Sequence, residues 1–196
     1  MQAEKVVFLD RDGTINVEKG YLHRPEDLIL IPGAARAIGL LNANGYKTVV
    51  VTNQAGVARG YYTEEDVRVL HECLNERLKQ EDAHIDLFFY CPHHPQHGIG
   101  EFKKECGCRK PASGMLAMAE QYFQVDKAHS YMIGDNAGDM GAGKNYGVTT
   151  ILVGTGYGQE IKRQGSVHYD YFAEDLLEAV KLVIGGPKDK KLNTPQ

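Results

Sequence analysis

The stretch FLDRDGT, residues 8–14, decides the fold class because it shows a strand that ends at two acidic residues. It overlaps the apolar run KVVFL, residues 5–9, which predicts a buried strand ending at Asp10. Residues two apart on an extended chain face the same way, so Asp10 and Asp12 are expected to project into one space. Gly13 then allows a sharp turn. Two close carboxylates repel unless a divalent cation or a shared proton lies between them.

The rest of the chain repeats this alternation of apolar strands and helical patterns. Further strands are expected at KTVVV, IDLFFY, SYMI and VTTILV, which are residues 47–51, 85–90, 130–133 and 148–153. Helices are expected over 33–44, after the capping-box pattern of Thr63 and Asp66, over 113–123, briefly after Asp135, and over 173–184. Continuous apolar strands between helices indicate an α/β class with a doubly wound, mainly parallel sheet and helices on both faces.

Composition sets the limits of this interpretation. The chain has 196 residues, 42% of them hydrophobic, which predicts one domain over residues 1–185 with a disordered tail over 186–196. The net charge is −4 and the basic residues are scattered, which argues against a nucleic-acid or membrane partner. The opening MQAEKVVFLDRDG lacks a secretory pattern, and the few cysteines are clustered. We therefore expect a cytoplasmic protein, acting as a monomer on a small molecule.

Two more polar residues end predicted strands, and a lysine follows the cysteine cluster. Asp135 ends one strand within IGDNAGD, with Asp139 one helical turn later. Thr52 ends another strand in VTNQAG, and Lys110 lies in CRKP. In a parallel sheet these positions meet beyond the carboxyl ends of the strands, near a switch in strand order. Alone, an Asp or Thr here caps a turn and a Lys is a solvated charge. Together, acids that bind a cation, a hydroxyl and a lysine suit an oxyanionic substrate such as a phosphoryl group.

A cysteine- and histidine-rich segment, YCPHHPQHGIGEFKKECGCRKP, covers residues 90–111. Cys91, His93, Cys106 and Cys108 form a C-x-H…C-x-C pattern that could hold Zn²⁺ with four protein ligands and no open position. A reduced, unliganded loop or a Cys91–Cys106 disulfide are the alternatives. The remaining candidates are weaker: His94 and His97 are expected in the loop surface, and Cys73 is expected to pack in a helix.

The motifs FLDRDGT, VVVTNQAGVARG, CRKP and MIGDNAGD, in this order, resemble the four motifs of the haloacid dehalogenase (HAD) phosphatase superfamily. The segments GTINVEKGYLHRPEDLILIPGA and CPHH…CGCRKP are similar to the branch that contains heptose-bisphosphate and histidinol-phosphate phosphatases. The resemblance covers residues 6–156. It implies a HAD-like Rossmannoid fold without a large cap domain, and it favours a zinc-bound loop over residues 91–108.

The resemblance also implies a role for each matching residue. Asp10 would be the nucleophile that forms an aspartyl-phosphate, and Asp12 the general acid and base. Mg²⁺ would be held by the Asp10 carboxylate, the Asp12 main-chain carbonyl and Asp135. Thr52 and Lys110 would bind the transferring phosphoryl group. The expected substrate contacts are Glu18, Lys19, Gly20, Tyr21, Asn53, Gln54, Ala55, Arg109 and Lys110.

The expected function is removal of the C7 phosphate of D-glycero-D-manno-heptose 1,7-bisphosphate, for nucleotide-activated heptose synthesis. Histidinol-phosphate phosphatase is the alternative, and the anomer preference is left open. A silent zinc-stabilised binding module is disfavoured by the intact acidic positions, and a nucleic-acid end phosphatase by the missing basic groove. One departure is Asn136, where relatives often carry Lys, so phosphoryl binding is expected to depend more on Lys110.

Overall fold

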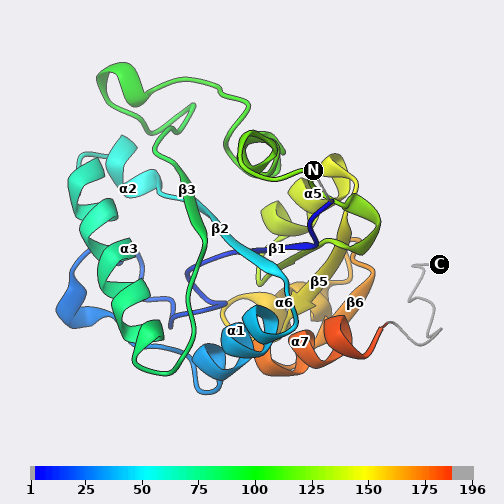
Figure 1. Ribbon diagram of the computed structural model, residues 1–196. Helices are drawn as coiled ribbons and strands as arrows, with labels where there is room; N and C mark the ends of the chain where they lie inside the picture. The colour runs from blue at the N-terminus through cyan, green and yellow to red at the C-terminus, as the bar shows by residue number, and fades with distance from the viewer. Residues whose placement is uncertain (1–2, 187–196) are drawn as a thin grey trace.

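A six-stranded, all-parallel β-sheet forms the centre of the computed structural model, which describes residues 3–186 (Figure 1). The strands lie in the order β3-β2-β1-β4-β5-β6. Their bounds are β1 Val6–Leu9, β2 Lys47–Asn53, β3 Leu87–Cys91, β4 Tyr131–Gly134, β5 Thr149–Val153 and β6 Tyr171–Ala173. The chain therefore builds one half of the sheet outward from β1 to β3, then returns to β4 beside β1 and builds the other half.

The sheet is covered on both faces because its central strands are apolar on both sides. In β1, Val7 and Leu9 join one core cluster, whereas Val6 and Phe8 join the other. Helices α1, α3 and α7 supply side chains to the first cluster, and α4 and α5 supply the second. Figure 1 shows α1 and α7 lying together below the sheet and α5 on the opposite side. This confirms the doubly wound class.

Helix starts follow local capping signals. The helices are α1 Ala34–Ala43, α2 Ala55–Ala58, α3 Glu64–Lys79, α4 Gly114–Met118, α5 Ala137–Tyr146, α6 Gly158–Gln164 and α7 Leu176–Gly185, with 3-10 turns η1 Pro25–Asp27, η2 Gly100–Phe102, η3 Ala119–Gln121 and η4 Lys127–His129. The predicted capping box of Thr63 and Asp66 is present at α3. Asn136 and Asp139 form a second one at α5, which ends at Gly147 with a φ of 90°.

Some predicted bounds are wrong. The helix expected over 113–123 is α-helical only over Gly114–Met118 and tightens to a 3-10 turn, η3. The helix expected from Ala173 begins at Leu176, because Ala173 pairs with Val153 as the end of β6. The sequence patterns also missed α2, α6 and β6, which are short. The tail predicted over 186–196 lies, from residue 187 on, outside the described residues.

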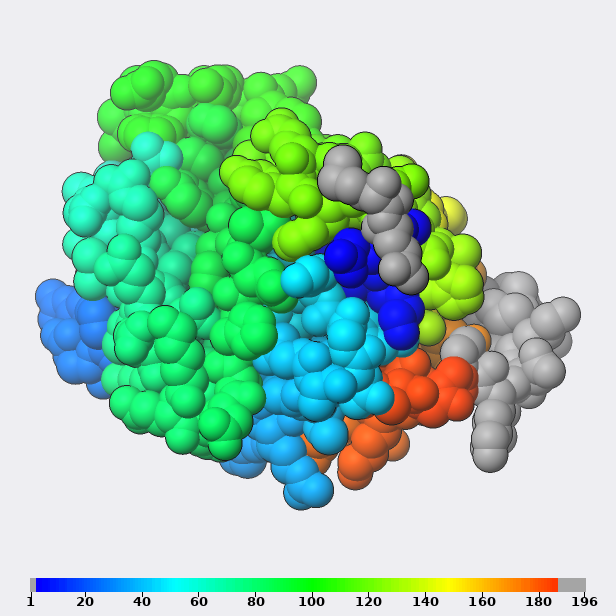
Figure 2. Space-filling model, in the orientation of Figure 1, coloured from blue at the N-terminus to red at the C-terminus, as the bar shows by residue number. Residues whose placement is uncertain are grey.

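The segment over residues 91–108 stands out from the sheet at the carboxyl end of β3 (Figures 1 and 2). Its tip packs on the start of α3, where Phe102 contacts the small cluster of Val57, Tyr62 and Val67. The Ile99 main-chain N–H donates to the Ala58 carbonyl at 2.8 Å. Over residues 3–186 no insertion forms a separate cap domain, and no helix there is long and apolar enough to span a membrane.

Candidate active site

The acidic residues lie where the sheet changes direction. Asp10 follows β1 and Asp135 follows β4, and these neighbouring strands carry the chain into opposite halves of the sheet. Ligands of open α/β sheets bind at such a switch, beyond the carboxyl ends of the strands. Asp139 joins them from the first turn of α5. Carboxylate oxygens of all three residues lie within 4.8 Å of one another; we call this group the carboxylate cluster.

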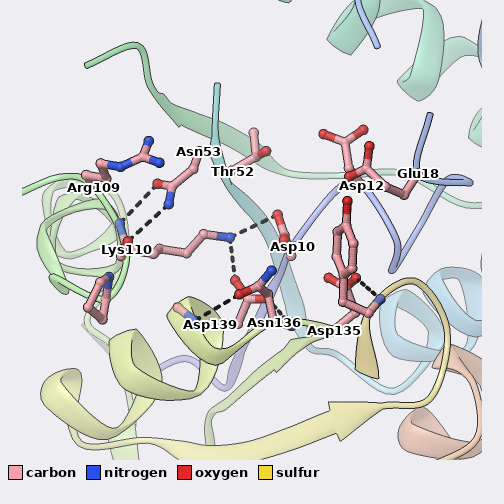
Figure 3. Close-up of a pocket in the computed structure, with 13 residues that line it drawn as sticks. Asp10, Asp12, Glu18, Thr52, Asn53, Arg109, Lys110, Asp135, Asn136 and Asp139 are labelled. Carbon is pink, nitrogen blue, oxygen red and sulfur yellow. Dashed lines mark hydrogen bonds and ion pairs between the residues drawn. The ribbon is translucent and has the colours of Figure 1, made fainter. Parts of the chain in front are cut away.

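Lys110 is the positive centre of the site. Its Nζ lies 2.9 Å from Asp10 Oδ1 and 2.6 Å from Asp139 Oδ1 (Figure 3). It also donates to the Val51 carbonyl at 2.7 Å. The side chain is only 2% exposed, so these ion pairs are shielded from water. Asn53 fixes the residue by exchanging two hydrogen bonds with the Lys110 main chain, at 3.0 and 3.1 Å.

One lysine does not balance three carboxylates. Burial raises the pKa of Asp10 well above its usual range, helped by the charges of Asp139 and Asp135 and opposed by Lys110. Burial, followed by the Asp139 charge, raises the pKa of Asp135 to about 7. The carboxylates and the ammonium leave a formal charge of −2 when all are ionised. A hard divalent cation with oxygen ligands, such as Mg²⁺, fits this donor set.

Two glycines make room for the Asp135 carboxylate. A Cβ at Gly13, which has a φ of 77°, would lie 2.2 Å from Asp135 Oδ2, and one at Gly156 would lie 2.0 Å from it. The Tyr157 main-chain N–H donates to the same oxygen at 2.8 Å. The Thr155 hydroxyl donates to the Gly13 carbonyl at 2.6 Å. The loops after β1 and β5 are thus tied together around Asp135.

Asp12 is held apart from the carboxylate cluster. Its side chain pairs with the fully buried Arg11, whose Nη2 lies 2.9 Å from Asp12 Oδ2, and it accepts from Asn16 at 2.9 Å and Gln54 at 3.2 Å. Arg11 also meets His71 Nε2 at 3.3 Å. The expected sharing of a cation or proton between the Asp10 and Asp12 side chains is therefore replaced by an Arg11–Asp12 pair, although both acids line one pocket.

The pocket over the cluster has a volume of about 400 Å³ and shares four lining residues, Asp12, Glu18, Asn53 and Tyr157, with a second pocket of about 240 Å³. We call them the phosphoryl pocket and the adjoining pocket. The first is lined by Asp10, Asp12, Glu18, Thr52, Asn53, Arg109, Lys110, Pro111, Asp135, Asn136, Gly138, Asp139 and Tyr157. The second is lined by Asp12, Glu18, Gly20, Tyr21, Asn53, Gln54, Ala55, Tyr62 and Tyr157. The structure thus gathers every candidate catalytic and substrate-contact residue except Lys19, which is exposed and lines neither pocket.

Six of these lining residues were not among the predicted site residues: Pro111, Asn136, Gly138 and Asp139 in the first pocket, Tyr62 in the second and Tyr157 in both. Asp139 was visible as an acid one helical turn after Asp135, but it was not given a ligand role. Tyr157 and Tyr62 lie in loops that carry no strand-end signal. Asn136, which departs from the usual Lys, serves locally as the N-cap of α5, and its N–H donates to Asp139 Oδ2 at 3.0 Å. Asn136 thereby holds Asp139 in position toward Lys110.

The four expected zinc ligands also meet, and we call them the Cys/His cluster. The three sulfur atoms of Cys91, Cys106 and Cys108 lie 3.2 to 3.5 Å apart, and His93 Nδ1 lies 3.5 Å from Cys108 Sγ. All three cysteines are free thiols, which excludes the Cys91–Cys106 disulfide in this structure. Sulfur ligands at about 2.3 Å from one Zn²⁺ stand about 3.8 Å apart, so the group fits a tetrahedral ion.

The other histidines of the segment lie outside this cluster. His94 Nδ1 accepts main-chain N–H bonds from Gln96 and His97, at 3.2 and 3.1 Å, which turns the loop. Arg109 follows the last cysteine and donates to the His93 carbonyl at 3.2 Å. The Cys/His cluster is therefore joined directly to Arg109 and Lys110, two lining residues of the phosphoryl pocket.

Comparisons with known proteins agree with this geometry. Residues 107–179 match the HAD-hydrolase-like family model. The chain is 45% identical over 164 residues to the D-glycero-beta-D-manno-heptose-1,7-bisphosphate 7-phosphatase of Vibrio cholerae, covering 83% of this chain and 87% of that protein. It is 46% identical over 151 residues to the enzyme of the same name from Escherichia coli K12, covering 76% and 79% of the two chains.

A solved structure extends the likeness to three dimensions. The D,D-heptose 1,7-bisphosphate phosphatase of B. bronchiseptica, crystallised with magnesium and phosphate, superposes with a TM-score of 0.83 at 32% identity. The match covers 92% of this chain and 98% of that one. Since the relatives are well over 30% identical and are matched along most of their length, this chain belongs to the heptose-1,7-bisphosphate 7-phosphatase family of HAD-type phosphoric monoester hydrolases.

Proposed function

We propose that this protein removes the C7 phosphate of D-glycero-β-D-manno-heptose 1,7-bisphosphate in a Mg²⁺-dependent reaction. The observation that carries the proposal is the carboxylate cluster with Lys110 at its centre, at the switch point of the sheet and on the floor of the phosphoryl pocket. The β anomer follows the names of the relatives. We further propose that residues 1–185 act as one domain, as a monomer, and that the protein works in a reducing cytoplasm, where cysteines without disulfides are usual.

The residues divide into roles along one reaction. Asp10 attacks phosphorus and forms an aspartyl-phosphate, while the bond from phosphorus to the C7 oxygen breaks. Asp12 gives a proton to that leaving oxygen, then takes one from the water that releases phosphate from Asp10. Lys110 and the Thr52 hydroxyl bind the phosphoryl oxygens. Asp10, Asp135 and the Asp12 carbonyl would hold Mg²⁺, whose charge would offset the repulsion between a carboxylate and a phosphate.

A substrate panel tests this function. Both anomers of the heptose bisphosphate and histidinol phosphate are each assayed for phosphate release, with Mg²⁺ and with Mg²⁺ removed by a chelator. We expect the β anomer to have the highest kcat/KM and the activity to need Mg²⁺. Preference for histidinol phosphate would identify the protein as a histidinol-phosphate phosphatase. If phosphate were released from none of these substrates, the protein would be a catalytically silent binding module.

A further inference from the structure

Tyr157 lies on the wall that the two pockets share, and none of the motifs assigned it a role. It is the residue before α6, and its main-chain N–H is bound to Asp135. Its side chain, in contrast, is 52% exposed. The backbone of Tyr157 is therefore fixed at the carboxylate cluster, whereas its ring is free to meet a ligand that reaches both pockets.

The charges of the two pockets differ. Arg109 and Lys110 line only the phosphoryl pocket. The residues that line the adjoining pocket include two carboxylates, those of Asp12 and Glu18, and no basic side chain. Arg59 lies near, with its guanidinium 5.9 Å from the ring centre of Tyr21, but is not part of the lining. Asp12 is already paired with Arg11, so a second phosphate group in the adjoining pocket would meet the Glu18 carboxylate and no basic side chain in the lining, which is unfavourable.

The adjoining pocket suits an uncharged chain of hydroxyl groups instead. Three tyrosines line it, Tyr21, Tyr62 and Tyr157, and tyrosine offers an apolar ring face together with a polar edge. The Gln54 amide is already bound, donating to Thr52 and accepting from Tyr62. One Glu18 oxygen accepts from the Gly20 N–H, so the groups left to a ligand are the other Glu18 oxygen and the exposed rings and hydroxyls of Tyr21 and Tyr157. A few polar groups among aromatic walls are typical of small-molecule sites.

Glu18 and Tyr157 lie close together and line the same pockets. The Glu18 charge is the largest cause that raises the pKa of the Tyr157 phenol, followed by burial and the charge of Asp135. Both residues line the phosphoryl pocket, the adjoining pocket and an outer pocket beside Ile31. They therefore form the border that a substrate crosses when its phosphate lies over Asp10.

We propose that Tyr157 is a specificity-determining residue, and that its ring and the Glu18 carboxylate hold the hydroxyl-bearing carbon chain of the substrate in the adjoining pocket. The second phosphate of a bisphosphate then lies outside this pocket. The inference rests on the proposed function in that the substrate is a sugar bisphosphate. Aromatic packing on the carbon chain favours sugar phosphates over small phosphoryl donors that lack such a chain, whereas the phosphoryl pocket alone accepts both.

The first test compares two substrates on Tyr157 variants. Acetyl phosphate carries a phosphoryl group without a hydroxyl-bearing chain. For Tyr157→Ala we expect kcat/KM for the heptose bisphosphate to fall at least tenfold more than that for acetyl phosphate, chiefly through KM. Tyr157→Phe should restore most of the loss, and Tyr122→Ala, at an exposed tyrosine outside both pockets, should change neither. Equal losses on both substrates would overturn the proposal.

The second test fixes the place of the second phosphate. Glu18→Gln is assayed with the heptose bisphosphate and with the 7-monophosphate of the same sugar. We expect KM to rise by a similar factor for both, because the anionic acceptor of the substrate hydroxyls becomes a neutral amide with one acceptor oxygen. A lower KM for the bisphosphate alone would show that its second phosphate enters the adjoining pocket. Wild-type protein reports separately on the proposed function: if it prefers another polyol phosphate, that function fails and the Tyr157 comparison is made on the preferred substrate.

Discussion

The carboxylate cluster and the Cys/His cluster are held in place by different means. Asp10 and Asp135 follow central strands whose residues are fully buried, and Asp139 is fixed by the cap of α5. The cysteines lie beside the second core cluster, but with His93 they join the two ends of a segment, residues 92–105, that is mostly exposed. The fold itself therefore positions the carboxylate cluster. The loop closed by the Cys/His cluster is instead expected to be ordered by the metal ion that its four ligand atoms would hold.

This difference suggests that the carboxylate cluster carries the reaction and that the Cys/His cluster holds a loop in place. Hard carboxylate oxygens and a buried lysine can bind and exchange a hard cation and a phosphoryl group. Soft thiols with an imidazole form a closed set for one ion and leave no position for a substrate. Changes in the first cluster should remove activity and spare the fold. Changes in the second should loosen residues 91–108 and weaken substrate binding through Arg109.

The largest expected effect is the loss of activity in Asp10→Asn. We expect kcat to fall on the order of 10⁴-fold or more, the scale of removing a catalytic nucleophile. The melting temperature should stay the same or rise, because a charge leaves a cluster with excess negative charge. Phosphate release and thermal unfolding measure the two effects. Asp27→Asn, at an exposed carboxylate, is the matched control, and wild-type rates in Asp10→Asn would refute the mechanism.

A smaller effect is expected from Cys106→Ser. The variant should lose zinc, measured by metal analysis against about one equivalent in wild-type protein. KM should rise about tenfold with little change in kcat, because Arg109 loses its support while Asp10 and Lys110 stay on the core. Cys73→Ser, at a half-buried thiol in α3, should keep both the zinc and the KM. Absence of zinc from the wild-type protein would contradict the assignment.

The strand-end acids could be predicted from sequence because the signal is local. An apolar run followed by Asp10 or Asp135 predicts a strand and places the acid at its carboxyl end. The C-x-H…C-x-C spacing likewise indicates which four side chains could bind a metal ion. The parallel, doubly wound class follows from the alternation of strands and helices, and the structure confirms it.

The remaining features depend on contacts between distant segments. The insertion of Lys110 between Asp10 and Asp139 requires β3, the Cys/His segment and α5 to meet. The burial of Arg11 could not be expected from its type, since arginine is rarely fully buried without a partner. The three-residue strand β6 is too short for periodicity to show, and Tyr157 is placed by its bond to Asp135.

The smallest expected effect concerns His71, which contacts Arg11, the ion-pair partner of Asp12. The ring is 5% exposed and stacks on Phe88 with centroids 4.7 Å apart. Burial, with the Arg11 charge, lowers the pKa of His71 to about 3. In the unfolded chain it titrates near 6.5. Above pH 6.5 the ring is neutral in both states, so it does not change the free energy of unfolding. As the pH falls from 6.5 toward 3, the unfolded chain binds a proton that the folded protein does not, and the free energy of unfolding drops by about 2 kcal/mol at pH 5.

Replacing His71 with Gln keeps an acceptor for Arg11 and removes the titrating group. Whatever the variant loses in stability at pH 7.5, the further loss between pH 7.5 and 5.0 should be smaller than in wild-type protein by about 2 kcal/mol. Urea unfolding at the two pH values measures this difference, and His84→Gln, at an exposed ring, is the control. Equal acid losses in wild type and His71→Gln would show that the ring is protonated in the folded protein. Arg11 would then face a second positive charge, and the framework under Asp12 would need another source of stability.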